Sequence, residues 1–197
     1  MSRNNSTVLF FLSLTLFGLQ ACIGEEKELI PKPKGYFRLP EPEKKYLLYD
    51  SLCPFSFEYP VYSKIQPYKR GDEVRPCWFD LQFPLYNATV YMSYEDVKGD
   101  ARPYLEDSRT LVYKHTVKAN AIDEILVNDP QRKVYGIIYQ IQGDAASNCQ
   151  FHLTDSLHHF IRGSLYFNSS ANADSVAPAL AFLRQDVEHI TQTLRWK

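Results

Sequence analysis

Several short segments of the chain alternate apolar and polar residues, which is typical of β-strands with one buried face. In Pro54–Tyr59 the aromatic side chains face one way, while Ser56 and Glu58 face the other. Further segments with a strand-like pattern are Lys45–Tyr49, Trp78–Phe83, Ala88–Tyr94, Lys133–Gly143, Ser147–Thr154 and His158–Phe167. The segment Ile122–Val127 also begins like a strand, whereas the polar segment Ser63–Pro76 is interpreted as a loop.

Two other segments place apolar residues at the spacing of an α-helix. Asp100–Ala119 is predicted as the first helix, because Pro103 suits its first turn and basic residues gather towards its end. Ser175–Trp196 is predicted as the second, with Ser175 as its N-terminal cap. The apolar stripe of this second helix consists of Leu180, Leu183, Val187, Ile190 and Leu194.

The order of these elements is strands, helix, strands, helix. Because the connections between consecutive strands are short, we expect an antiparallel β-sheet with helices packed on it, which is an α+β fold. The exported α/β/α sandwiches of the Mog1/PsbP type have a similar element order. This is a resemblance in fold alone, and it implies no function.

An apolar run near the N-terminus, Val8–Leu19, has the length of a signal-peptide core and is shorter than the ~20 residues of a membrane-spanning helix. It leads into Leu19-Gln20-Ala21-Cys22, which resembles a lipoprotein cleavage site. We predict that residues 1–21 are a cleaved lipoprotein signal peptide and that acyl chains on Cys22 insert into a lipid bilayer. An ordinary secretory signal with a chance cysteine is the alternative. Residues 22–35 are predicted as a tether, and residues 36–197 as a single globular domain.

The composition indicates a folded domain without affinity for nucleic acid. The chain is 45% hydrophobic and 14% aromatic, and its formal net charge is −1. That hydrophobic content is enough for a core, and there is no basic excess to attract phosphates.

Three cysteines remain after the predicted cleavage, and an exported chain meets an oxidising compartment. Cys53 and Cys77 each begin an aromatic-rich strand pattern, so we predict a disulfide between them. Cys149 lies inside a later apolar run and is interpreted as a buried thiol. The cysteines lack the spacing of metal ligands, and we expect neither a metal nor a cofactor.

The strongest candidate for catalysis is Ser108 with His115 and Asp107 on the first predicted helix. Ser108 and His115 are two helical turns apart, about 10 Å, which is too far for contact between a nucleophile and its base. His158 and His159 are adjacent in a strand and point to opposite faces, so they cannot share a metal. We therefore expect no catalytic residue and no enzymatic activity.

Aromatic residues are concentrated in the first half of the chain. Tyrosine and tryptophan are common at protein interfaces, where a surface must be both apolar and wet. We expect Tyr62, Tyr68 and Tyr86, in predicted loops, to contribute to a docking surface. Ordinary packing in the core is the alternative for each of them.

Stretches covering most of the chain after Cys22 follow the sequence of one known family in order. They are PKPKGYFRLPEPEKKY (Pro31–Tyr46), CPFSFEYPVYSKI (Cys53–Ile65), PCWFDLQFP (Pro76–Pro84), EDSRTLVYKHTVKANAIDE (Glu106–Glu124), VYGIIYQIQGDAAS (Val134–Ser147), QFHLTDSLHHFIRGSLYFN (Gln150–Asn168) and DVEHITQTLRWK (Asp186–Lys197). With these stretches the chain resembles the gliding-motility lipoprotein GldD family. The resemblance implies an outer-membrane lipoprotein that is needed for gliding, is linked to type IX secretion and is not an enzyme.

From the anchor and the resemblance we expect a lipid-anchored, non-catalytic envelope protein. It would support assembly or stability of the gliding and type IX secretion machinery and bind other proteins of that machinery. Acids after Cys22, Glu25 and Glu26, resemble signals for display at the cell surface. A secretion-machinery partner favours the periplasmic face, and both locations stay open. The alternative function is an outer-membrane lipoprotein that binds a small ligand or a glycan by aromatic stacking.

Asp-Ser dipeptides followed by an apolar residue resemble the O-glycosylation sites of exported proteins in gliding bacteria. Their serines are Ser51, Ser156 and Ser175. Ser51 is the candidate with the fewest other structural roles, because Ser175 is needed as a helix cap.

Overall fold

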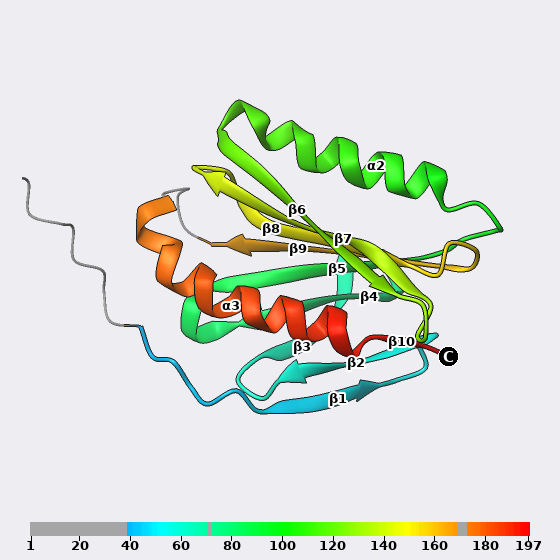
Figure 1. The fold of residues 1–197 in the computed structure, drawn as a ribbon. Helices are drawn as coiled ribbons and strands as arrows, with labels where there is room; N and C mark the ends of the chain where they lie inside the picture. Colours follow the sequence, from blue (N-terminus) through cyan, green and yellow to red (C-terminus); the bar gives the residue numbers. More distant parts are fainter. Residues whose placement is uncertain (1–38, 71, 169–172) are drawn as a thin grey trace, which may run out of the picture. The chain divides into compact units, whose positions relative to one another are not determined.

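A seven-stranded antiparallel sheet forms the centre of the fold (Figure 1). The structure, a computed structural model, describes residues 39–70, 72–168 and 173–197. The chain divides into two units, Met1–Gly35 and Tyr36–Lys197, and the described residues all belong to the second. The strand order in the large sheet is β3-β4-β5-β9-β8-β7-β6. Its strands are β3 (Lys64–Arg70), β4 (Glu73–Phe83), β5 (Ala88–Asp96), β6 (Ala119–Asp129), β7 (Val134–Gly143), β8 (Ser147–Thr154) and β9 (His159–Phe167).

A second sheet of three strands has the order β1-β2-β10. Its strands are β1 (Tyr46–Asp50), β2 (Phe55–Pro60) and β10 (Arg195–Trp196). Phe55 and Phe57 of β2, which the alternation placed on one face, are both buried. Their ring centroids lie 6.4 and 5.8 Å from that of Phe79 on β4. The two sheets therefore share one hydrophobic core.

Helix α3 (Ala173–Thr193) covers the apolar face of the large sheet (Figure 1). The stripe that the helical spacing predicted is buried, with exposures from 0% to 8%. On the sheet, the same core takes alternate residues of β4, β5, β8 and β9, as the two-residue period of a strand requires. Each buried aliphatic side chain stabilises the fold by ~1.5–3 kcal/mol. This interface therefore contributes strongly to stability.

Helix α2 (Arg102–Tyr113) lies on the opposite face of the large sheet (Figure 1). Its residue Val112 packs against Tyr139 and Ile141 of β7. Near its other end, Ala101 packs against Phe160 of β9. With helices on both faces of an antiparallel sheet, the protein is an α+β fold of layers α/β/α, as the element order predicted.

The prediction of a loop at Ser63–Pro76 is wrong, because this segment contains β3 and the start of β4. β3 is the edge strand of the large sheet, and charged residues such as Lys64 and Lys69 are typical of an edge with one side in solvent. Pro67 is tolerated because the register with β4 shifts between Pro67 and Lys69. Pairing with β4 decides the structure here, and the polar composition concealed it.

The first predicted helix ends earlier than Ala119. α2 stops at Tyr113 and is followed by the 3₁₀-helix η2 (Lys114–Val117), after which β6 begins. The hydroxyl of Thr116 donates to the carbonyl of Tyr113 at 2.7 Å. Such local bonds compete with the helical backbone ladder.

The second predicted helix is displaced at both ends. α3 begins at Ala173, so Ser175 is not its N-terminal cap. It ends at Thr193, and the following residues form β10 against β2. The carbonyl of Leu194 accepts a hydrogen bond from Arg132 Nη1 at 2.7 Å, which satisfies one of the groups left open at the helix end.

Candidate functional site

Ser108 and His152 form a polar pair between α2 and the large sheet. Ser108 Oγ and His152 Nδ1 lie 3.2 Å apart. From the sequence, His115 was the candidate partner of Ser108 and was judged too distant for contact. The sequence held one indication of this pair. The alternation of β8 places His152 on the same face of the sheet as Gln150. Only the position of α2 over that face brings Ser108 to it.

The pair is closed off from solvent. Ser108 is 1% exposed and His152 is 3% exposed. Burial, with a smaller effect of the nearby Arg162, lowers the pKa of His152 to about 4, so the imidazole is neutral at neutral pH. Its ring stacks on Phe160 and lies 5.8 Å from the ring of Tyr139.

A nucleophilic serine needs an approach to its Oγ and a base oriented by a third polar group. Here the ring of His152 is held by aromatic packing, and within the described chain it has no hydrogen bond to a carboxylate. In this geometry the pair can fix α2 to the sheet, a contribution of about 1 kcal/mol for one hydrogen bond.

A polar network continues from the pair along β8 and β9. Gln150 Oε1 accepts hydrogen bonds from Arg162 Nη2 at 2.8 Å and from Ser164 Oγ at 3.3 Å. Burial lowers the pKa of Arg162, and burial together with Arg162 lowers that of His115. Arg162 Nε and Gln150 Nε2 have no hydrogen-bond partner among the described residues, and neighbouring atoms cover both. Asp107 is exposed on the outside of α2, so Ser108, His115 and Asp107 do not assemble as an open site.

The carboxylate of Asp186 on α3 is the centre of a second buried polar group. Its Oδ1 accepts from Lys44 Nζ at 2.8 Å and from the Tyr46 hydroxyl at 3.1 Å. Its Oδ2 accepts from the Tyr62 hydroxyl at 2.6 Å. Lys44 Nζ also lies 3.5 Å from the ring centroid of Phe182. We call Lys44, Tyr46, Tyr62 and Asp186 the Asp186 cluster.

The Asp186 cluster fixes the segment before β1 onto α3. Asp186 is 0% exposed, and its three donors supply the partners that a buried carboxylate requires. Burial and the adjacent carboxylate raise the pKa of Tyr46 to about 12 and raise that of Tyr62 as well. Burial lowers the pKa of Lys44, against the attraction of Asp186. The chain that follows the predicted tether is thus attached to the folded domain at this point.

The three tyrosines predicted as a docking surface lie in different environments. Tyr62 belongs to the Asp186 cluster. Tyr86, in the 3₁₀-helix η1 (Pro84–Tyr86), is 7% exposed and is a core residue. Both rings pack against Phe182 of α3, a contact between segments distant in the chain. Tyr68 on β3 is half-buried. The structure therefore does not bring the three together on one exposed surface, which also removes them as a stacking platform for a glycan.

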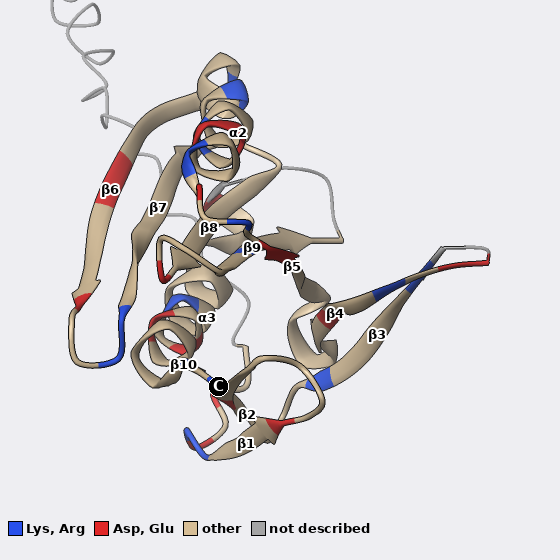
Figure 2. Cartoon of the chain, turned by 90° about the vertical axis from the view of Figure 1, so that its right-hand side faces the viewer, with Lys and Arg blue, Asp and Glu red and all other residues tan. Residues whose placement is uncertain are grey.

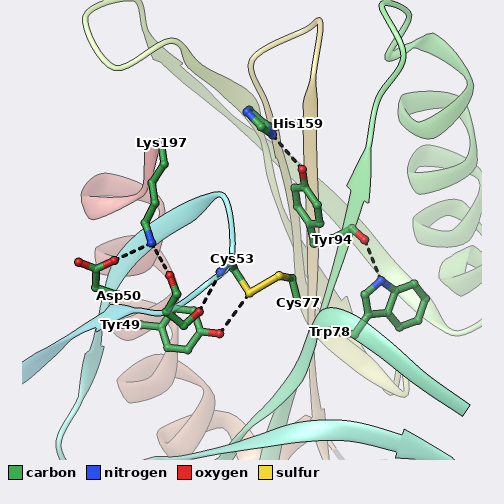
Figure 3. The surroundings of a disulfide bond; sticks show 9 residues. Tyr49, Asp50, Cys53, Cys77, Trp78, Tyr94, His159 and Lys197 are labelled. Atoms are coloured by element: carbon green, nitrogen blue, oxygen red, sulfur yellow. Dashed lines mark hydrogen bonds and ion pairs between the residues drawn. A yellow bond between two sulfur atoms is a disulfide. The ribbon is translucent and has the colours of Figure 1, made fainter.

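Cys53 and Cys77 are joined by a disulfide, the pair that the sequence predicted (Figure 3). The bond links the loop between β1 and β2 to β4 and thereby attaches the small sheet covalently to the large one. Beside it, Lys197 Nζ pairs with Asp50 Oδ1 at 2.6 Å and ties the C-terminus to the end of β1 (Figure 3). Cys149 is a free, buried thiol, and burial raises its pKa to about 12.

The predicted modification sites have separate positions. Ser51 is exposed, and its Oγ accepts a hydrogen bond from the backbone of Cys53 at 3.2 Å. Ser156 is exposed in the turn between β8 and β9, and Ser175 is exposed on α3. Cys22 lies outside the described residues. Glycosylation of the serines and lipidation of Cys22 stay predictions.

Metal binding and membrane crossing were searched over the described part of the chain. Within residues 39–70, 72–168 and 173–197, no group of three or more His, Cys, Asp or Glu is arranged to hold a metal ion. In the same ranges no helix combines the length and the apolar character needed to span a bilayer.

The family model described as gliding motility lipoprotein GldD matches residues 26–196, which is most of the chain. A comparison with curated proteins finds no match. Among solved structures, the solution structure of cyanobacterial PsbP (CyanoP) from Synechocystis sp. PCC 6803 is similar, with a TM-score of 0.49 and 8% sequence identity, over 79% of this chain and 95% of that one. The chain belongs to the gliding motility lipoprotein GldD family, which gives it a role in gliding motility and a membrane-associated location in the cell envelope.

Proposed function

We propose that this protein is a lipid-anchored, non-catalytic factor at the outer membrane that supports assembly or stability of the gliding and type IX secretion machinery. The family match over residues 26–196 carries the proposal. The lipoprotein-like sequence Leu19–Cys22 supports an N-terminal anchor. The periplasmic face is favoured, because a secretion-machinery partner would be accessible there.

An anchor at Cys22 would hold the domain close to its partners. Each buried CH₂ of an acyl chain contributes ~0.8 kcal/mol, so two or more chains give stable anchoring. Because anchoring raises the effective concentration at the membrane, the contact with a partner can itself be weak. The Asp186 cluster supports this arrangement, since it fixes the beginning of the folded domain against α3.

The closed pair of Ser108 and His152 supports a non-catalytic role. Ser108 Oγ has no open approach, and the imidazole is oriented by aromatic packing. Replacing Ser108 with alanine should therefore leave gliding intact, at a cost in stability of about 1 kcal/mol. A Ser108→Ala protein that is folded and abundant but does not support gliding would contradict the non-catalytic role.

The anchor is tested by substituting Cys22 with alanine in the full chain. Cells grown with labelled palmitate should label the wild-type protein but not Cys22→Ala, and gliding should be lost with the label. Cys149→Ala is the matched control, because that thiol is buried and should not be acylated. Normal gliding by an unlabelled Cys22→Ala protein would contradict the role of the anchor.

The partner is tested by crosslinking in intact cells followed by purification of the tagged, lipidated protein. Subunits of the secretion machinery should be enriched relative to the Cys22→Ala strain. If crosslinking recovers none of them, the proposed support of that machinery is wrong.

A further inference from the structure

β6 is an unprotected edge of the large sheet. It pairs with β7 alone among the described residues. Its 11 residues exceed the about 5–6 of an average strand, and no residue in it is fully buried. The register with β7 shifts once, between Ala119 and Ala121, and then runs without a shift to Asp129. The strand contains no proline, lysine or arginine. Its outer backbone groups are thus available to pair with a further strand.

The opposite edge of the same sheet is protected. β3 carries Lys64, Pro67 and Lys69, and its register with β4 shifts between Pro67 and Lys69. Lysines, prolines and bulges are the features that prevent an edge strand from pairing with another chain. Figure 2 shows the basic residues along β3 and the acidic ones on β6. The open edge is therefore a specific property of β6.

A groove with a volume of about 340 Å³ runs beside β6, on the face that carries α3. The sheet contributes an apolar lining of Ile125, Leu126, Val127 and Ile138. The rest of the lining is charged or polar and consists of Arg132 in the turn after β6 and of Glu188, Thr191 and Gln192 on α3. In an added strand, alternate side chains would point towards this face. One apolar side chain of such a strand can therefore enter the groove, as in other cases of strand addition.

Two carboxylates of β6 lack a cationic partner among the described residues. Asp123 accepts a hydrogen bond from Gln142 Nε2 at 2.7 Å, and Glu124 accepts one from the Tyr113 hydroxyl at 2.9 Å. Both donors are neutral, so the negative charges are not compensated by an adjacent cation. Because consecutive residues of a strand point to opposite faces, the two charges lie on the two sides of the edge.

We propose that β6 is the docking edge for an extended segment of another envelope protein, and that this segment carries two consecutive Lys or Arg residues next to two consecutive apolar residues. The basic residues pair with Asp123 and Glu124. One apolar residue enters the groove at Ile125, and the other covers Leu126, which is 73% exposed. The envelope location of this partner rests on the proposed function.

Charge distinguishes such a partner from a second copy of this chain. Antiparallel pairing of two β6 strands about their centres would place Glu124 opposite Glu124, with Asp123 of each copy close by. Like charges directly opposite each other destabilise a pair of strands. A basic segment gains from the same carboxylates.

The test measures fluorescence anisotropy with the full lipidated chain in detergent and two labelled synthetic peptides. One peptide contains the sequence Thr-Val-Ile-Lys-Arg-Thr, which in antiparallel pairing places Lys-Arg opposite Glu124 and Asp123, and the other has two glutamates in place of Lys-Arg. The first should bind saturably and the second at least about tenfold more weakly, because two cross-strand charge pairs change sign. The double substitution Asp123→Lys with Glu124→Lys should invert this preference.

Two single substitutions give a matched comparison of exposed apolar residues. Leu126→Lys on β6 should weaken binding of the Lys-Arg peptide. Val74→Lys on β4, where the wild-type side chain is 67% exposed, should not. Thermal unfolding checks that each variant is folded. If the charge-reversed variant does not fold, the double substitution Asp123→Asn with Glu124→Asn replaces it, and this substitution should remove the preference for the Lys-Arg peptide.

The following results would overturn the proposal. Equal binding of both peptides by the wild type, or binding unaffected by the β6 variants, would mean that the edge does not select a basic strand. Self-association in sedimentation that Leu126→Lys abolishes would assign the edge to a second copy. If the peptide binds only after residues 23–35 are deleted, the occupant of the β6 edge is the chain's own tether. If Cys22→Ala stops gliding while the folded charge-reversed protein supports it, the proposed function stands and the β6 inference fails.

Discussion

Replacing His152 with glutamine should remove part of the protein's sensitivity to acid. Burial lowers the pKa of His152 from 6.5 to about 4, so the folded state favours the neutral ring. The unfolded chain binds a proton between these two values, whereas the folded chain does not. The stability that depends on the neutral ring is therefore complete above pH 6.5 and is lost as the pH falls towards 4. At 1.36 kcal/mol for each pH unit, the loss is about 3 kcal/mol.

The assay is urea unfolding of wild type and His152→Gln at several pH values from 7.5 to 4, with the disulfide intact. At pH 7.5 the variant should be less stable by about 1–3 kcal/mol, because the hydrogen bond to Ser108 and the aromatic packing are disturbed. The difference should close towards pH 4. Other groups that titrate in this range, such as His115, are present in both proteins, so the comparison isolates His152.

The control is His158→Gln, which replaces a histidine that is exposed in the turn before β9 and lies outside the buried pair. If His152→Gln and wild type lose stability in parallel between pH 6.5 and 4, the imidazole is not held neutral by burial. The interpretation of the pair with Ser108 as a closed structural contact would then be wrong.

Three further changes test the fold. Asp186→Asn leaves a partly buried ammonium without its counter-charge and should lower the free energy of unfolding by about 3–5 kcal/mol, measured in urea; an unchanged midpoint would show that the lysine reaches solvent instead. Gly163→Ala places a methyl group against the ring of Phe151 on the neighbouring strand and should cost about 1–3 kcal/mol, so an unchanged melting temperature would argue against this close packing. Replacing Cys53 and Cys77 with alanine should cost about 3 kcal/mol and speed amide exchange in β1 and β2, and unaltered exchange there would mean that the small sheet does not depend on the disulfide.

Regular elements with strong periodicity were predictable from the sequence. The apolar stripe from Leu180 to Leu194 and the alternation of Phe55 and Phe57 are local patterns, and both sets of residues are buried as predicted. The polar segment Ser63–Pro76 was misread as a loop. The strand at Lys64–Arg70 is polar and contains a proline, so only its pairing with β4 reveals it.

The candidate sites were less predictable, because they join residues far apart in the chain. Ser108 meets His152 only after α2 has packed on β8. Tyr62 was expected on a docking surface, but α3 brings Asp186 to its hydroxyl. The open edge of β6 depends on the order of strands in the sheet, and a strand pattern does not state whether it lies at the centre or at the edge.

By itself the sequence determined the strands and helices with a clear period, the disulfide pair and the membership in a lipoprotein family. The periodic elements depend on neighbouring residues, and the family membership depends on extended similarity along the chain. The tertiary structure alone decided which polar groups are buried together and which edge of the sheet is open. The physical reason is that burial and strand order arise when distant segments pack, and local propensity carries no information about that packing.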